Sequence, residues 1–213
     1  MKRKLLLLAA SLACLLFSGC VIGRRTIDLP VTQLDGSGTK GSIFVGTVED
    51  ARTFQNKPKD ASTPSIDGDV NATSKEQLSQ MIGRQRNGYG MAMGDIALSA
   101  GDSVVKRTRA LLEEGLRRHG YTITAEASGD AATVKIDEFW AWFTPGMWAV
   151  SFEANVACKI TLTRGGTATT ITVRGYALNK GQVASDANWQ LAYSRAFNDF
   201  LANLETELSK AGL

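Results

Sequence analysis

One stretch in the second half of the chain restricts the possible folds more than any other feature of the sequence. Between residues 152 and 163, apolar and polar side chains alternate. Because successive side chains of a β-strand point to opposite faces, the alternation predicts a strand that covers a core on one side and meets water on the other. The apolar side is formed by Phe152, Ala154, Val156, Cys158, Ile160 and Leu162. The chain must therefore supply a second layer that covers one face of a sheet.

Two segments with helical periodicity are suited to form that layer. The first follows Asp102, which is able to cap it, and ends at Gly120, and the second runs from about Asp186 to Leu208. Their apolar positions recur at the spacing of one helix face, so we expect both helices to pack on the sheet. These positions are Val104, Val105, Thr108, Leu111, Leu112, Gly115 and Leu116 in the first helix, and Trp189, Tyr193, Phe197, Phe200, Leu201, Leu204 and Leu208 in the second.

The remaining apolar runs predict further strands. An edge strand is expected around Ile27 and Leu29, because Pro30 would remove a hydrogen-bond donor from a central strand. Asn87-Gly88 between two apolar runs predicts a tight hairpin turn. Other strands are expected at 41–50, 121–124, 133–143, 148–163 and 169–178, and the polar, aperiodic segment 51–73 is expected to be a long mobile loop.

This order of elements predicts an α+β fold. We expect an antiparallel or mixed sheet with two helices packed on one face, arranged as a single domain. A chain of this length buries about 70% of its unfolded surface in one core, so a second domain is not required.

The first nineteen residues have the pattern of a secretion signal. Basic residues at 2–4 precede an apolar run at 5–16, which is shorter than the roughly 20 residues of a transmembrane helix. The stretch Leu16-Phe17-Ser18-Gly19-Cys20 resembles the lipobox read by the lipoprotein signal peptidase. We therefore expect a cleaved signal at 1–19, a lipidated tether at 20–41 and a periplasmic α+β domain at 42–213. A soluble secreted protein with an incidental Cys20 is the alternative.

Lipid on Cys20 would hold the protein at a membrane. The lipobox implies a diacylglycerol on the thiol and a further acyl chain on the freed amine, and two or more chains give a firm anchor. Retention at the inner membrane is typical of an Asp after the cysteine, whereas this chain has Val21. The expected location is the periplasmic face of the outer membrane, with the inner membrane as the alternative.

The charge balance and the cysteines restrict the partners and the redox chemistry. Removal of the three basic residues at 2–4 reduces the 24 basic residues to 21, equal to the 21 acidic residues. The mature protein is neutral and has no net field for nucleic acid, so no nucleic-acid partner is expected. Loss of Cys14 with the signal and lipidation of Cys20 leave Cys158 unpaired, and we expect it in the core.

Several local sequences resemble one family of envelope proteins. They are the lipobox, Ile82-Gly83-Arg84 with Asn87-Gly88-Tyr89-Gly90, His119-Gly120-Tyr121, and Ala132-Thr133-Val134-Lys135-Ile136. With the order of elements, they resemble the YajG-type family of proteobacterial lipoproteins over most of the mature chain. That family is similar in topology to the amino-terminal domain of TolB and to other periplasmic assembly lipoproteins, which bind proteins or envelope components. The resemblance implies a fold and a location more than an activity, because its motifs are structural.

Motifs for catalysis or metal binding are not evident. The single histidine, His119, lies in the last turn of the first helix, where a cation complements the helix carbonyls. The sequence contains neither HExxH nor CxxC, so no metal site and no cofactor besides the covalent lipid are expected. Asp137 and Glu138 are adjacent in a predicted strand, so they are expected on opposite faces. We therefore do not expect an enzyme.

Two features are candidates for binding. The first is an aromatic stretch at one predicted turn, whose candidate contact residues are Trp140, Trp142, Phe143, Met147 and Trp148. Side chains at odd and even positions of a strand point to opposite faces, so one face cannot bury all of these rings. They either form an exposed contact with a protein or a bilayer, or they cover the core beneath the long loop. The second is the pair Arg84 and Arg86, which would contact lipopolysaccharide phosphates or an acidic partner, or belong to a solvated, charge-balanced face.

These observations predict a binding function in the cell envelope. The leading hypothesis is an outer-membrane-anchored periplasmic lipoprotein that acts as a non-enzymatic binding or scaffold module and contacts an envelope protein through the aromatic hairpin. The second is an accessory lipoprotein of an envelope transport system that holds lipid or lipopolysaccharide between sheet and helices. An enzyme is the third.

Overall fold

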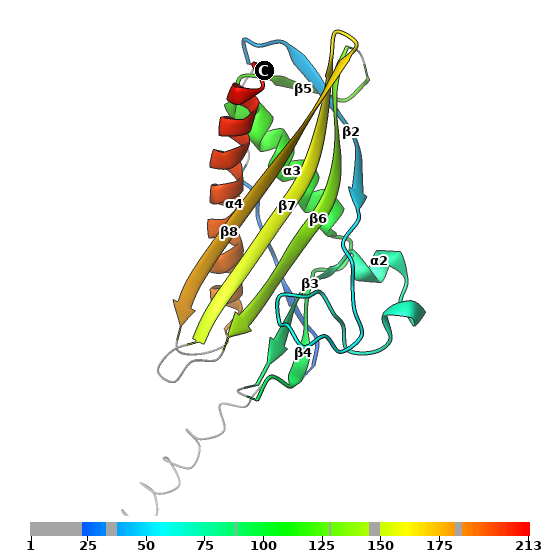
Figure 1. Cartoon of the computed structure of the whole chain (residues 1–213), viewed down its shortest axis with the longest axis vertical. Coiled ribbons are helices and arrows are strands. Elements are labelled where there is room, and N and C mark those ends of the chain that lie inside the picture. The colour runs from blue at the N-terminus through cyan, green and yellow to red at the C-terminus, as the bar shows by residue number, and fades with distance from the viewer. Residues whose placement is uncertain (1–22, 33–37, 88, 128, 145–149, 182–184) are drawn as a thin grey trace, which may run out of the picture.

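A mixed eight-stranded sheet forms the centre of the protein in the computed structural model, which describes residues 23–32, 38–87, 89–127, 129–144, 150–181 and 185–213 (Figure 1). This architecture confirms the predicted single-domain α+β fold. The strands are β1 (Arg25–Ile27), β2 (Ser42–Asp50), β3 (Met81–Arg86), β4 (Ala92–Leu98), β5 (Thr122–Thr124), β6 (Asp130–Thr144), β7 (Val150–Arg164) and β8 (Thr167–Gly181). The helices are α2 (Lys75–Leu78), α3 (Val104–Arg118), α4 (Asp186–Lys210) and the 3₁₀ turn η1 (Val70–Ala72).

Strand β6 is the branch point of the sheet. One edge of β6 pairs antiparallel with β7 along nearly its whole length, and β7 pairs antiparallel with β8. The other edge is shared by two strands: β2 pairs parallel with the first half of β6, and β3 pairs parallel with its second half at residues 141 and 142. β5 lies outside β2, while β4 and then β1 lie outside β3. The sheet therefore forks along one edge of β6.

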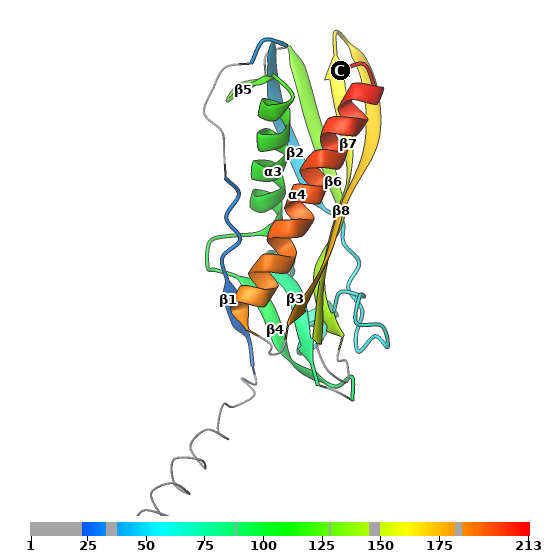
Figure 2. The same cartoon turned by 90° about the vertical axis from the view of Figure 1, so that its left-hand side faces the viewer.

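The two predicted helices cover one face of this sheet (Figure 2). α4 packs on β7 and β8, and α3 packs on β2 and against α4. Ser103 caps α3 by accepting a hydrogen bond from the Lys106 N–H, so the expected cap at Asp102 lies one residue too early. Asp102 instead accepts a hydrogen bond from the Ser103 N–H. The close fit of α4 depends on Gly175, where a Cβ atom would lie 2.2 Å from the Ala196 carbonyl oxygen.

A β-bulge in β6 changes which side chains face the helices. Ile136 pairs with Cys158, but the next pair is Glu138 with Ala157, so Asp137 is an extra residue. Before the bulge, Val134 and Ile136 lie in the helix-side core, and after it the odd-numbered residues 139, 141 and 143 do. The even-numbered side chains after the bulge therefore face the outer side of the sheet.

The segment 51–73, expected to be a mobile loop, packs against the outer face of the sheet. Ile66 is buried in a second cluster with Met81, Ala97 and Trp140. Arg52 lies at the fork, where its guanidinium donates to the carbonyl oxygens of Met81 at 2.7 Å and Phe139 at 2.8 Å. The segment is thus held by buried contacts that its polar, aperiodic sequence did not indicate.

The hairpin of β3 and β4 was predicted, but its connection is longer than the expected two-residue turn. The last pair of the ladder is Arg86 with Ala92. The Asn87 N–H donates to the Met91 carbonyl at 2.8 Å, and the Asn87 side-chain oxygen accepts from the N–H groups of Tyr89 and Met91. Asn87 therefore closes a wider loop with its side chain.

The beginning of the described chain lies along the edge of the sheet. β1 pairs parallel with β4, which confirms the expected edge strand, and Ile27 and Leu29 are buried in the core. Residues 25–29 of the expected tether therefore belong to the packed sheet. No helix within residues 23–213, leaving aside the undescribed positions, is long and apolar enough to cross a membrane.

Candidate functional site

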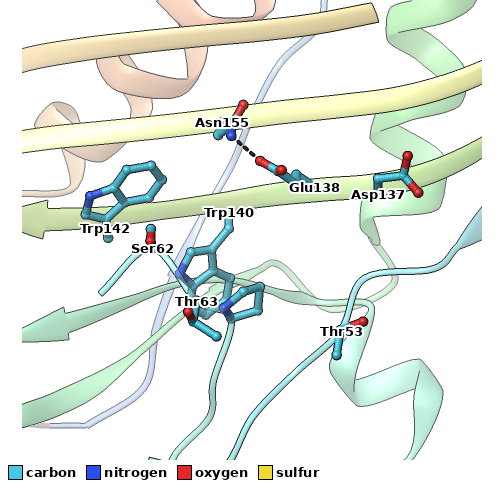
Figure 3. A pocket seen from close by; sticks show the side chains of 9 residues that line it. Thr53, Ser62, Thr63, Asp137, Glu138, Trp140, Trp142 and Asn155 are labelled. Atoms are coloured by element: carbon cyan, nitrogen blue, oxygen red, sulfur yellow. Dashed lines mark hydrogen bonds between the residues drawn. The ribbon is translucent and has the colours of Figure 1, made fainter. Parts of the chain in front are cut away.

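A pocket of about 430 Å³ lies between the long segment after β2 and the outer face of β6 and β7 (Figure 3). The segment supplies one wall, and the two strands supply the floor. The lining residues are Thr53, Ser62, Thr63, Pro64, Asp137, Glu138, Trp140, Trp142 and Asn155. Two carboxylates, one amide, three hydroxyls and two indoles thus surround one space, and none of these nine residues is basic.

The bulge explains why both carboxylates reach the same pocket. Regular alternation would place Asp137 and Glu138 on opposite faces of the strand, as the sequence led us to expect. In the structure both line the pocket, because Asp137 is the extra residue of the bulge. The expectation that this pair is separated was therefore wrong.

The carboxylates are partly compensated by groups on the neighbouring strands. Glu138 accepts hydrogen bonds from the Asn155 side-chain amide and, at 3.1 Å, from the Arg174 guanidinium. Asp137 lies 3.7 Å from the Lys159 ammonium. The Asn155 Oδ1 atom is buried and has no hydrogen-bond partner among the residues that the structure describes.

Two of the predicted aromatic residues form the walls of the pocket, to different extents. Trp140 is buried under the segment after β2, and its Nε1–H donates to the Ala61 carbonyl at 3.2 Å. The Phe54 ring meets the Trp140 ring edge-on with a centroid distance of 5.9 Å. Trp142 is half-buried and packs against the same cluster. Of the two alternatives for Trp140, cover of the core beneath the long loop is therefore the one that the structure shows.

Of the other three aromatic-stretch residues, Phe143 is the one that the structure describes, and it lies on the opposite face of the sheet. Phe143 faces the helices, where it is buried and contacts Phe152 with a centroid distance of 6.1 Å. It is therefore a core residue and offers no surface to a partner. Met147 and Trp148 lie outside the described residues.

The candidate basic residues hold the long segment to the hairpin. Arg84 is buried; its guanidinium donates to the Ile66 carbonyl and lies 3.3 Å from Asp67 and 3.7 Å from Asp95. Arg86 donates to the carbonyls of Gly90 at 3.1 Å and Pro58 at 3.3 Å. Both groups are engaged within the protein, which corrects the expectation of a free or solvated basic face at these residues.

Burial also affects the charges in this network. It raises the pKa of the Asp95 carboxyl, against the opposing effects of the Asp67 N–H and the Arg84 charge. Burial and the neighbouring Arg84 charge lower the pKa of Arg86. The donors of Arg84 and Arg86 are thus used within the protein, and the network is not arranged to receive a phosphate.

His119 lies at the end of α3, as predicted, and connects distant parts of the chain. Its Nε2 atom is 2.7 Å from the Lys40 ammonium, and its Nδ1 atom is 2.9 Å from a Glu205 carboxylate oxygen. The ring is buried at the C-cap of the helix. Among the described residues, no group of three or more His, Cys, Asp or Glu side chains is placed to hold a metal ion.

Comparisons with known proteins give distant matches among solved structures only. No known family and no curated protein matches the chain. Among solved structures, it is similar to protein XCC0632 from Xanthomonas campestris, described as DUF330, with 10% identity, a TM-score of 0.48, and coverage of 89% of this chain and 97% of that one. The hypothetical protein CT253 from Chlamydia trachomatis gives 12% identity, a TM-score of 0.34, and coverage of 81% and 99%. At these values the comparisons carry no argument about function.

Proposed function

We propose that this chain is a lipid-anchored lipoprotein of the cell envelope that binds a protein partner and catalyses no reaction. The observation that carries the proposal is the pocket on the outer face of β6 and β7, where the carboxylates of Asp137 and Glu138 line one space with two indoles. A basic side chain of an envelope protein supplies the N–H donors that these acceptors need.

The chemistry of the pocket matches an ammonium or guanidinium group in three ways. Charge-assisted hydrogen bonds to carboxylates are the stronger class of hydrogen bond in proteins. The half-buried ring of Trp142 lines the same space, and indole is the aromatic group that attracts cations most strongly. Lys159 and Arg174 compensate the carboxylates from outside the pocket and are mostly exposed, with side-chain exposures of 57% and 62%. They are therefore free to turn away when a partner's cation enters.

The transport alternative needs room for a lipid between the sheet and the helices. In the described structure that interface is filled with packed rings: Phe139 stacks on Tyr193 with a centroid distance of 5.2 Å, and Phe152 meets Trp189 edge to face at 5.1 Å. All four rings are buried. This packing favours protein docking over lipid binding. Arg84 and Arg86 donate their hydrogen bonds within the protein, which disfavours binding of lipopolysaccharide phosphates at those residues.

The location is part of the proposal and rests on the lipobox at Cys20. We infer attachment to the periplasmic face of the outer membrane, since Val21 replaces the Asp typical of inner-membrane retention. Cys20→Ser should release the protein from the membrane fraction, because two or more acyl chains supply the attachment. Mass spectrometry of the mature amino terminus should find an acylated Cys20. Unchanged fractionation of the variant, or an unmodified thiol, would contradict the anchor.

The pocket is tested with a charged probe and its neutral isostere. We expect arginine amide to shift the Trp142 indole N–H resonance of the mature protein, and citrulline amide, which has the same shape without the charge, to shift it much less. Asp137→Asn should weaken the arginine effect by about tenfold, since one charge-assisted contact contributes about 1.5 kcal/mol. Asp130→Asn is the matched control, because Asp130 lies on the same strand and pairs with Arg164 away from the pocket. Equal shifts with both amides would refute cation recognition.

In cells, a photo-crosslinking residue at the exposed Ser62 on the pocket wall should capture the partner. The cross-link should weaken in the Asp137→Asn background and remain in the Asp130→Asn background. Loss of the cross-link in both backgrounds, or in neither, would separate partner binding from the pocket.

A further inference from the structure

The pairing of the edge strands places two parts of the chain at the same end of the molecule. β1 runs parallel to β4, so the start of β1 and the start of β4 lie at one end of the sheet. The start of β4 is also the end of the β3–β4 hairpin loop (Figure 2). The Gly23 N–H donates to the Met93 carbonyl at 3.0 Å, so the beginning of the described chain is bonded beside this loop.

Chain length then limits how far the lipidation site can lie from the hairpin. Cys20 precedes Gly23 by three residues. Three residues span at most about 11 Å even when fully extended. An acylated Cys20 therefore holds the loop end of the β3–β4 hairpin close to the bilayer surface, whatever path residues 20–22 take.

The hairpin loop presents the most exposed large apolar side chains in the described part of the protein. Tyr89 is 92% exposed and Met91 is 60% exposed. Hydrogen bonds within the hairpin stabilise this loop. The Asn87 side-chain oxygen accepts from the N–H groups of Tyr89 and Met91, and Arg86 donates to the Gly90 carbonyl. The two side chains thus project from a preformed loop and have no packing role in the domain.

We propose that Tyr89 and Met91 form a second contact with the membrane, entering the boundary between headgroups and acyl chains beside the lipid on Cys20. Tyrosine is enriched at this depth of a bilayer, because its ring is apolar and its hydroxyl remains hydrated. The guanidinium of Arg24, next to Gly23, lies 3.7 Å from the buried Asp95 carboxylate and is half-exposed, so it also brings a basic group to this end of the sheet. The inference rests on the proposed anchor and adds an orientation to it: the long strands β6–β8 extend away from the membrane (Figure 1).

The mature lipoprotein allows a direct test through one reactive thiol. Cys14 leaves with the signal, Cys20 carries lipid, and Cys158 is buried, so Tyr89→Cys introduces the one accessible cysteine. A fluorophore on this thiol is measured in vesicles of phosphatidylethanolamine and phosphatidylglycerol with brominated acyl chains. Thr167→Cys is the matched control, since it is exposed at the opposite end of strands about 50 Å long.

We expect brominated lipid to quench the label at position 89 at least about threefold more than the label at position 167. Equal quenching at both positions, with Cys20 shown by mass spectrometry to be acylated, would overturn the hairpin contact and leave the anchor intact. An unmodified Cys20 would overturn the anchor and the inference together. A label at position 89 that is shielded in intact cells but unquenched in vesicles would identify a protein at the loop, which also overturns the inference.

Discussion

The two faces of the central sheet are covered by different means. On one face, α3 and α4 pack on a continuous apolar cluster that includes the contacting rings of Phe139, Tyr193 and Phe197. On the other face, an irregular segment covers a cluster of four buried apolar residues and relies on the buried guanidinium groups of Arg52 and Arg84. The first face is sealed by hydrophobic burial and the second by hydrogen bonds.

The difference follows from how each covering element satisfies its own backbone. A helix bonds its peptide groups internally, so it is able to present a purely apolar surface. An irregular segment leaves carbonyl groups that need donors when they are buried. Arg84 meets this need at the Ile66 carbonyl. Arg52 belongs to the segment itself and ties it to the fork of the sheet, where it donates to three carbonyls of β3, β6 and α2 and is paired with Asp50 at 2.8 Å. A buried arginine is thus able to hold an irregular segment against a sheet.

The largest expected loss of stability comes from disrupting the packing of the helices on their face of the sheet. Gly175→Val should lower the free energy of unfolding by about 4 kcal/mol, because the new side chain meets the backbone of α4 and forces the helix off β8. Urea unfolding followed by circular dichroism measures the loss. Gly46→Ala is the control, since its Cβ would have no neighbour closer than 3.4 Å. A similar loss in both variants would assign the effect to glycine flexibility.

A smaller effect is expected from breaking the loop-covered face. Arg52→Leu should cost about 3 kcal/mol, since it leaves buried carbonyls and the Asp50 carboxylate without their partner. Arg52→Lys should cost less, because an ammonium keeps the charge but not the planar fork. Limited proteolysis should show earlier cleavage within 53–73 in Arg52→Leu. If the segment stays as resistant as in the parent protein, Arg52 does not hold it.

The buried Asp95 carboxylate on the loop-covered face should make the stability of the protein depend on pH. Burial raises the pKa of Asp95 above its ordinary value of 3.8, so at a pH between the ordinary and the raised pKa the native state holds a proton that the unfolded state has released. The free energy of unfolding should therefore fall as pH rises through the interval above 3.8. Asp95→Asn, which keeps an acceptor for the Asp67 N–H, should flatten this part of the profile. An unchanged slope in the variant would assign the dependence to other carboxylates.

The smallest expected effect is on the reactivity of Cys158, the thiol buried in the helix-covered core. Burial, assisted by the charge of Asp137, raises the pKa of the Cys158 thiol well above its ordinary value. In the lipidated protein at pH 8, a thiol reagent should react with Cys158 on the order of a hundredfold more slowly than in urea. Rapid native labelling would show that this face opens more readily than its packing suggests.

The helix-covered face was largely predictable from the sequence. α3 lies within the segment predicted between Asp102 and Gly120, and α4 begins at the predicted Asp186 and extends two residues past the predicted end at Leu208. The alternation in β7 and its buried side were also correct. Each of these signals is local, since it depends on the spacing of apolar residues along one element.

The loop-covered face and the pocket were not predictable in the same way. The bulge at Asp137 leaves no mark in the sequence, yet it places Glu138, Trp140 and Trp142 on the outer face. In the aromatic stretch, large apolar residues occupy both odd and even positions, which indicated that apolar side chains would lie on both faces of the strand. The covering segment itself has no periodicity, so its packing depends on contacts between residues far apart in the chain.

The amino-acid sequence alone determined the class of fold, the positions of the helices and the long strands, and the expectation of a lipid anchor at Cys20. These conclusions depend on local sequence patterns, such as the spacing of apolar residues along one helix or strand. Steric limits on the backbone and the burial of apolar side chains connect such patterns to local structure. Only the tertiary structure decided that Arg52 closes a fork in the sheet, that two carboxylates meet at one pocket, and that Tyr89 projects beside the start of β1. The physical reason is that register, bulges and the fit of an irregular segment are set by pairings between distant residues.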